Sequence, residues 1–406
     1  MRKILFFALI ALITASCTTK NDPKPGEIVP LVLKANMKQK VTQDNKFAFD
    51  LLKSTIAHSD KPNVFISPLS VSMALGMAWN GADNETKTEM ERTLNMAGMT
   101  MDEINEYYQI MLTTLPKMDA ATKLNIANSI WYKTGFPVKN DYLKVNTDYF
   151  GAEVKELDFA KAWALDTINN WCARKTNNLI KKPLDNISAD AVMYLINAIY
   201  FKGVWTKKFD TKATVERNFT NEKNAQVKVN MMQQTDTFKY TIDDQAEYLD
   251  LPYGNKAFSM TVILPKEGKT TNEILRNLTL DNWNNILKNM TTQKVKVQLP
   301  RFKTQNSFEL KDVLTDMGMK KAFTTEADFS KISDYRLLIS RVIHSTFCEV
   351  NETGTEAAAV TIIVFETTSM PMYPEFYVNR PFVFVIREQS TGVILFAAKM
   401  GDVEKY

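Results

Sequence analysis

Few residues in this 406-residue chain are of the kinds that catalyse reactions. The chain has only two histidines, His58 and His344, and neither lies at a spacing that would let it bind a metal together with a neighbouring ligand. The sequence contains no Gly-x-Ser-x-Gly motif and no glycine-rich phosphate loop. It therefore predicts no enzyme, no catalytic residue, no bound metal and no cofactor.

Residues 349–369 are the segment whose residue types point most clearly to a function. A run of small residues at 355–359 is followed at 360–364 by five residues that strongly favour a β-strand. If residues 355–367 alternate as a strand does, the odd-numbered positions carry no charge, and the even-numbered face holds Glu356 and Glu366. The segment therefore suits two states, an exposed loop and a strand inside a sheet.

Residues 349–359, Glu-Val-Asn-Glu-Thr-Gly-Thr-Glu-Ala-Ala-Ala, resemble the hinge of the serpin family. Five other motifs follow in family order from about residue 40 onward: NVFISPLS at 63–70, NAIYFKGVW at 197–205, LPRFK at 299–303, ADFS at 327–330 and NRPF at 379–382. The resemblance implies an inhibitor whose exposed loop is attacked by a serine-type protease. The cleaved loop then inserts as a new strand of a central sheet, sheet A, and the protease is trapped as an acyl-enzyme.

The resemblance also implies roles for single residues at three places. The hinge comprises Glu352, Gly354, Thr355, Glu356, Ala357, Ala358, Ala359, Val360 and Thr361. The shutter, where sheet A parts, comprises Ser67, Ser70, Asn197 and His344. The breach, where the loop enters, comprises Trp205, Arg301 and Glu352. Arg301 stands where the family often has Lys, and we expect its ion pair with Glu352 to survive this exchange.

The family's spacing, counted from Gly354, places the scissile bond between Thr368 and Ser369. Counting back from residues 379–381 gives Met370–Pro371 instead, but a proline after the bond generally blocks serine proteases, so we prefer the first bond. Threonine on the acyl side suits the pockets of elastase-like or subtilisin-like proteases and not trypsin-like pockets. The alternative is a non-inhibitory serpin that acts as a binding or chaperone module, which the uncharged face of the hinge disfavours.

The elements that must position these residues are predicted from hydrophobic periodicity. Helical spacing marks the first half of the chain, at 45–58, 67–79, 86–98, 103–114 and 162–180. Strand patterns mark the second half, at 294–299, 382–386 and 393–396, with the last two joined by a turn at 390–392 into a hairpin buried on both faces.

Helices first and strands later predict an α+β domain. The resemblance implies the serpin fold, with N-terminal helices around the large sheet A, two smaller sheets and an exposed reactive-centre loop. At 176–178 the family usually has glycine in third place, and we expect Asn178 to keep the left-handed turn there.

Residues 1–16 predict an export signal of the bacterial lipoprotein type. Arg2 and Lys3 precede an apolar run too short to span a bilayer, and small residues lead directly to Cys17, although leucine is usual where Thr14 stands. We expect a lipidated Cys17, a tether over 17–40 and a single serpin domain over 41–406. The lipid anchor would place the protein at the outer membrane or cell surface. An ordinary signal with an incidental cysteine, and a periplasmic or secreted protein, is the alternative.

Composition adds little about other partners. The formal net charge is +4 and no block of Lys and Arg stands out, so nucleic acid and polyanions are not predicted partners. Residues 103–117, where some serpins gather basic side chains for heparin, hold a single lysine. Cys172 and Cys348 are expected to be buried and unpaired. We expect a monomer that contacts the membrane through its lipid alone.

Overall fold

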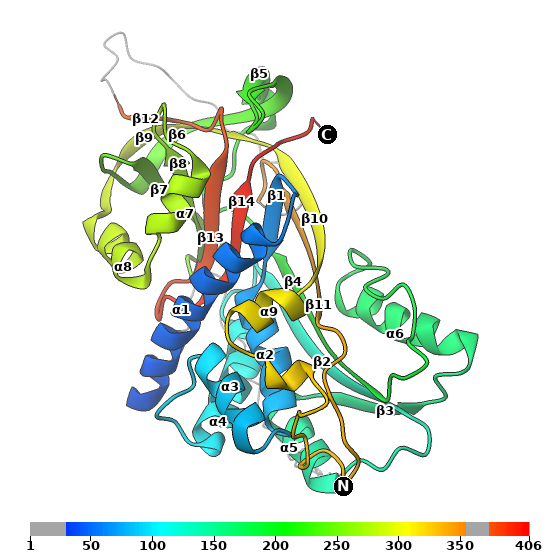
Figure 1. Cartoon of the computed structure of the whole chain (residues 1–406). Helices are drawn as coiled ribbons and strands as arrows, with labels where there is room; N and C mark the ends of the chain where they lie inside the picture. The colour runs from blue at the N-terminus through cyan, green and yellow to red at the C-terminus, as the bar shows by residue number, and fades with distance from the viewer. Residues whose placement is uncertain (1–29, 355–372, 406) are drawn as a thin grey trace, which may run out of the picture.

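A computed structural model describes residues 30–354 and 373–405 of the chain (Figure 1). Cys17, the Thr368–Ser369 bond and hinge residues 355–361 lie outside the described residues. The helices are α1 (Ala35–Ala57), α2 (Pro68–Trp79), α3 (Asn84–Thr93), α4 (Met101–Thr114), α5 (Asn140–Phe150), α6 (Ala162–Lys175), α7 (Thr271–Asn277), α8 (Leu280–Asn289) and α9 (Lys311–Asp316). The strands are β1 (Asn63–Ile66), β2 (Lys123–Lys133), β3 (Glu153–Leu157), β4 (Met193–Lys202), β5 (Val215–Thr220), β6 (Gln226–Ile242), β7 (Ala246–Tyr253), β8 (Phe258–Pro265), β9 (Thr291–Pro300), β10 (Phe302–Glu309), β11 (Ile343–Val350), β12 (Glu375–Tyr377), β13 (Phe382–Glu388) and β14 (Ile394–Met400).

The largest hydrogen-bonded sheet runs in the order β1-β14-β13-β8-β7-β6-β9-β12, with β5 attached to β6. The two smaller sheets expected from the sequence are continuous here, because the 17-residue β6 pairs with β9 and β5 along its length and with β7 near its end. Every residue of β13 and of β14 is buried, which confirms the hairpin predicted to be covered on both faces.

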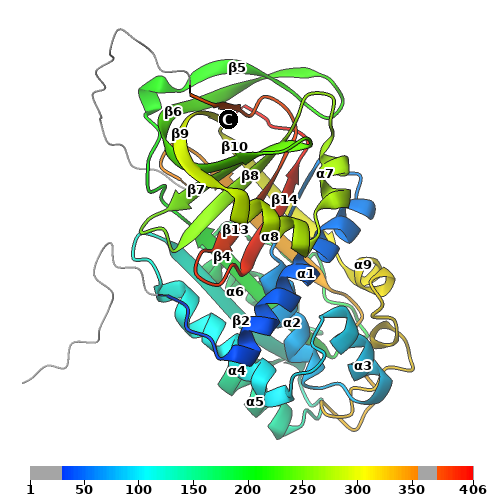
Figure 2. The same ribbon diagram turned by 90° about the vertical axis from the view of Figure 1, so that its left-hand side faces the viewer.

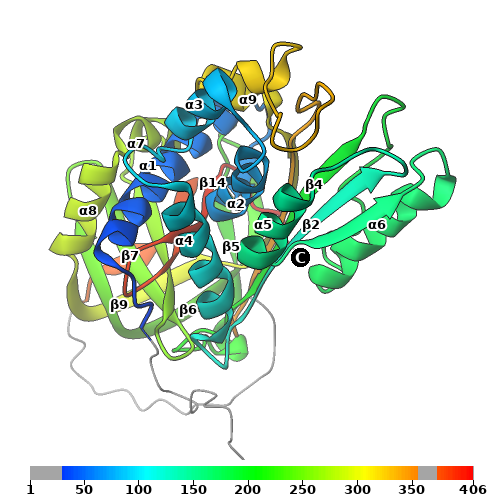
Figure 3. The ribbon, with the colours of Figure 1, turned by 90° about the horizontal axis from the view of Figure 1, so that it is seen from below.

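Sheet A is present as two hydrogen-bonded parts that lie next to each other. One part has the order β3-β2-β4 and the other is the pair β10-β11. Helix α6 covers the outer face of β2 and β4, and α2 lies on their other side (Figure 3). The break between β4 and β11 is where the sequence predicts the sheet to part.

Helix ends differ from the predicted spans for local reasons. The predicted helix 162–180 stops at Lys175 because the Thr176 hydroxyl bonds to the Cys172 carbonyl and accepts from the Ile180 amide. Asn178 has φ +61°, which confirms the left-handed turn expected there. Folded structure also begins before residue 41, inside the span assigned to the tether, since α1 begins at Ala35.

The two ends of the molecule differ in what they present. Strands β5, β6, β9 and β12 lie at one end, whereas α3, α4 and α5 lie toward the other (Figures 1 and 2).

Both expected thiols, Cys172 and Cys348, are buried and free. Across residues 30–354 and 373–405, no helix has the length and apolar character needed to cross a membrane.

Candidate functional site

The candidate site is the break in sheet A between β4 and β11. No β-ladder joins the two strands in the described part of the chain. They are connected at one end by residues 351–354, and part-way along by the first turn of α2. These two places coincide with the predicted breach and shutter.

Residues 351–354 reverse the chain at the end of β11. The Asn351 amide donates to the Gly354 carbonyl at 2.8 Å, and the Gly354 amide donates back to the Asn351 carbonyl at 3.1 Å. Gly354 also forms an antiparallel bridge with Val204, just beyond β4. Its φ of +132° and a Cβ position only 2.1 Å from the Gly203 carbonyl oxygen leave room for no side chain, so glycine is required here.

The three predicted breach residues meet at this turn. The Arg301 Nε donates to both carboxylate oxygens of Glu352, at 2.7 and 2.8 Å, and Nη2 lies 2.6 Å from Oε1. The Glu352 side chain is 4% exposed and that of Arg301 is 29% exposed, so the pair is largely removed from water. The Trp205 indole donates to the Asn351 carbonyl at 2.9 Å. The expected ion pair of Arg301 with Glu352 is therefore present.

The four predicted shutter residues are brought together through α2. The Ser67 amide donates to His344 Nε2 of β11 at 2.9 Å, whereas the Ser70 hydroxyl donates to the Asn197 side-chain oxygen of β4. His344 and Asn197 therefore do not need to touch each other, because one turn of the same helix contacts both sides of the break. Ser67, Ser70 and His344 are buried and Asn197 is partly buried, so these bonds matter, since an unpaired polar group there would cost free energy.

The protonation state of His344 follows from its surroundings. Burial lowers the pKa of this histidine from its usual 6.5 to about 4. The neutral ring can accept the Ser67 amide at Nε2, and a doubly protonated ring cannot. The bond between β11 and α2 is therefore intact at neutral pH and opposed in acid.

We expect the stability of the native protein to fall as the pH drops from about 6.5 to about 4. The pKa of His344 is lower in the folded than in the unfolded chain, so the unfolded chain binds the proton first in this window, and the loss approaches about 3 kcal/mol near pH 4. Chemical denaturation of the native protein across this range measures it. His344→Gln, which keeps an acceptor but does not titrate, should flatten the pH dependence. Equal pH profiles for wild type and His344→Gln would contradict this assignment.

Sequence reasoning missed three residues that complete the site. The Thr214 hydroxyl donates to Glu352, the Tyr253 ring stacks on Trp205 with centroids 4.4 Å apart, and the Asn128 side chain accepts from Asn197 at 2.7 Å. Each reaches its partner from a distant part of the chain. Only Asn128 carries a sequence signal, because it is a polar residue in the buried half of the apolar strand β2.

Residues 373–377, which follow the segment 355–372 (called the bait segment below), are anchored on β9. Residues 375–377 pair in parallel with 296–298, and the Glu375 carboxylate lies 2.8 Å from Lys296 Nζ and accepts from Gln298 at 2.9 Å. The Tyr373 ring lies 4.7 Å from Lys294 Nζ. Both ends of the segment 355–372 are therefore fixed to the same end of the molecule.

Comparison with known proteins agrees with this architecture. Residues 42–403 match the family model described as serpin (serine protease inhibitor). A serpin-like protein of Thermococcus kodakarensis is 37% identical over 94% of this chain and 88% of its own, and human serpin B3 is 35% identical over 88% and 98%.

Solved structures of serpins are also similar to this chain. The native state of the thermophilic serpin tengpin has a TM-score of 0.84 and 34% identity, and covers 93% of this chain and 96% of its own. Human thyroxine-binding globulin with thyroxine has a TM-score of 0.83 and 26% identity, over 91% and 100%. Serpins are for the most part protease inhibitors and not catalytic enzymes, and this chain is a member of the serpin family.

Proposed function

We propose that this serpin inhibits serine-type endopeptidases of elastase-like or subtilisin-like specificity. A protease cleaves the loop at Thr368–Ser369, the loop inserts between β4 and β11, and the protease remains as an acyl-enzyme. One observation supports the proposal most strongly. Gly354 pairs with Val204 beyond β4 and with Asn351 beyond β11, and both pairings give an inserted strand the same register.

The register follows from counting. Gly354 pairs antiparallel with Val204 on one side and with Asn351 on the other. Thr361 is seven residues after Gly354, and Asn197 and His344 are seven residues before these two partners. An inserted strand would therefore place Thr361 between the two shutter residues, in register with both neighbours.

The same register explains the distribution of charge in the loop. Residues directly opposite in an antiparallel pair point to the same face. Asn197 and His344 point toward α2, so odd-numbered loop residues would point inward and Glu356 and Glu366 outward. The thirteen residues from 355 to 367 would span about 43 Å at roughly 3.3 Å each, long enough to follow β4 and β11 from end to end.

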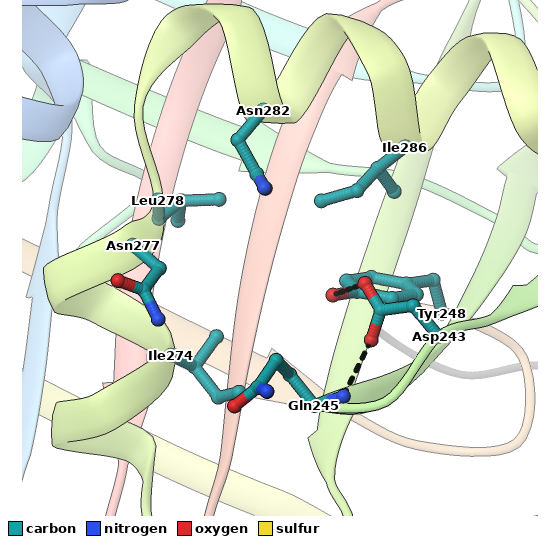
Figure 4. A pocket seen from close by; sticks show the side chains of 8 residues that line it. All are labelled: Asp243, Gln245, Tyr248, Ile274, Asn277, Leu278, Asn282 and Ile286. Atoms are coloured by element: carbon teal, nitrogen blue, oxygen red, sulfur yellow. Dashed lines mark hydrogen bonds between the residues drawn. The ribbon is translucent and has the colours of Figure 1, made fainter.

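A carrier of small molecules is the function that another family member suggests, since the structure of thyroxine-binding globulin contains thyroxine. In this chain a pocket lies between α7, α8 and the turn from β6 to β7 (Figure 4). Its volume of about 20 Å³ is close to that of one water molecule, whereas sites for drug-sized ligands hold about 300 Å³ or more. The Asp243 carboxylate in it is already bonded to Tyr248 and to the backbone. This pocket does not favour a carrier function.

The direct test is to mix the purified protein with pancreatic elastase and, separately, with subtilisin, and to run denaturing gels. Inhibition predicts a covalent band at the summed mass of both proteins less that of residues 369–406, which cleavage releases. The bond is identified by sequencing the released C-terminal peptide, which should begin at Ser369. Complete cleavage by every elastase-like and subtilisin-like protease, with no complex, would refute the proposal.

We also propose that the chain is exported and anchored through a lipid on Cys17. The support is the basic, apolar and small-residue order of positions 2–16 directly before that cysteine. Metabolic labelling with palmitate should mark the wild type and not Cys17→Ser. Labelling of both, or of neither, would contradict the anchor and leave the inhibitory proposal untouched.

A further inference from the structure

Positive charge is concentrated at the end of the molecule that anchors the bait segment. Residues 202–239 and 288–303 together hold thirteen Lys and Arg and four Asp and Glu, a net charge of +9 in a chain whose total is +4. These residues form β5, β6, β9 and the loops around them, which lie together at one end (Figures 1 and 2). We call these two ranges the basic pole.

The opposite end carries the opposite sign. Residues 83–114, which include α3 and α4, hold seven acidic and two basic side chains. The molecule is thus an electric dipole along the axis that ends at the bait segment. A field of this kind acts over a Debye length, about 10 Å at 0.1 M salt.

Most of the charge in the basic pole is not neutralised locally. Two of its four acids, Glu216 and Glu222, pair with Lys405 and Lys399, which lie outside it. Within the described chain, a further set of its cations lies at least partly exposed with no carboxylate within ion-pair distance: Lys208, Lys212, Arg217, Lys223, Lys228, Lys239, Lys288 and Lys294.

These charges border both anchors of the bait segment. On the proximal side, Arg301 and the loop ending at Thr214 contact Glu352. On the distal side, Lys294 and Lys296 contact Tyr373 and Glu375. A protease that holds the bait segment in its active site must lie over this surface.

From this placement we infer that the basic pole selects target proteases whose surface around the active-site cleft is acidic. The inference rests on the proposed inhibitory function and adds the charge of the partner to it. Steering between opposite charges raises association rates by about 10- to 1,000-fold, and the gain disappears in high salt. A polyanion would be the other class of partner, but the charges spread over a broad sheet surface around the bait segment and not along one helix.

The test compares two variants of equal net charge. The triple variant Lys212→Glu, Lys228→Glu, Lys239→Glu reverses exposed charges in the basic pole that make no contact in the breach or the distal anchor. The control Lys161→Glu, Lys133→Glu, Lys320→Glu reverses exposed lysines elsewhere. Each is mixed with two subtilisins whose surface residues beside the cleft are changed to Glu in one and to Lys in the other. Association rate constants are measured at about 0.01 M and about 1 M salt.

At low salt, the wild type and the control should inhibit the Glu-bearing subtilisin at least about tenfold faster than the Lys-bearing one. In the triple variant this rate ratio should fall several-fold, because the three substitutions lower the net charge of the basic pole from +9 to +3. At high salt the differences should vanish. Equal rates of the wild type with both subtilisins, or the same rate ratio for the triple variant as for the control, would overturn the inference even if covalent complexes form normally. Retention on heparin that is lost in the triple variant, together with equal subtilisin rates, would assign the basic pole to a polyanion and also overturn it. Failure to form any complex would instead refute the proposed function.

Discussion

Replacing Thr355 with arginine is expected to convert the protein from an inhibitor into a substrate. Position 355 lies outside the described residues, but the register set by Gly354 places it first in the inserted strand, opposite Gly203 and pointing inward. That space is already crowded, since even a Cβ on Gly203 would come within 2.5 Å of the Tyr253 ring. A guanidinium there would be buried without a partner, at a cost of several kcal/mol, which slows insertion on the order of 100-fold or more. Hydrolysis of the acyl-enzyme would then be faster than insertion of the loop, and denaturing gels should show cleaved protein in place of the covalent complex.

The neighbouring position supplies the control for this substitution. Glu356 falls on the outward face in the same register, so Glu356→Arg introduces the same side chain without burying it. This variant should form covalent complex as the wild type does. Loss of inhibition in both variants, or in neither, would contradict the assignment of faces on which the inserted strand depends.

Replacing Glu352 with lysine is expected to destabilise the uncleaved protein by at least about 3 kcal/mol. The substitution removes the buried carboxylate that accepts two bonds from Arg301 Nε and one from Thr214, and it puts a second cation against the guanidinium. The turn 351–354 is one of the two connections between β4 and β11, so the break should open at this end. Thermal unfolding of the uncleaved protein measures the loss.

The opened break also predicts self-association. Strand-forming residues at 360–364 of one molecule would find the exposed edges of β4 and β11 in another, so brief warming should produce a ladder of polymers on native gels. Glu352→Gln keeps the shape and removes only the charge, and it should fall between wild type and Glu352→Lys in both measurements. An unchanged melting temperature and no polymer for Glu352→Lys would contradict the role given to the breach.

Motifs allowed most of the site to be predicted before the structure. Ser67, Ser70 and Asn197 lie inside runs of residues typical of the family, and each is found at the break in sheet A with its partner. Long periodic segments also gave the central parts of the helices and strands. Their ends could not be predicted, because they depend on local bonds such as that of Thr176 or on left-handed residues such as Asn178.

Contacts between loops that are distant in the chain could not be predicted from the sequence. Thr214 is an ordinary polar residue until the fold brings it to Glu352, and the stacking of Tyr253 on Trp205 depends on how β7 meets the end of β4. The basic pole was missed for a related reason. Its charges are dispersed over two ranges separated by about 50 residues, and only the pairing of β6 with β9 collects them on one surface.

The melting temperature before and after loop cleavage reports directly whether the break in sheet A accepts residues 355–367. Insertion would bury the inward-facing apolar side chains of Ile363 and Phe365, worth roughly 2 kcal/mol each or about 4 kcal/mol in total. At about 2 °C per kcal/mol, cleavage by a protease that does not remain bound should raise the melting temperature by about 8 °C or more, and cleaved Thr355→Arg should gain little. A cleaved wild-type protein that melts at the same temperature as the uncleaved one would contradict the account.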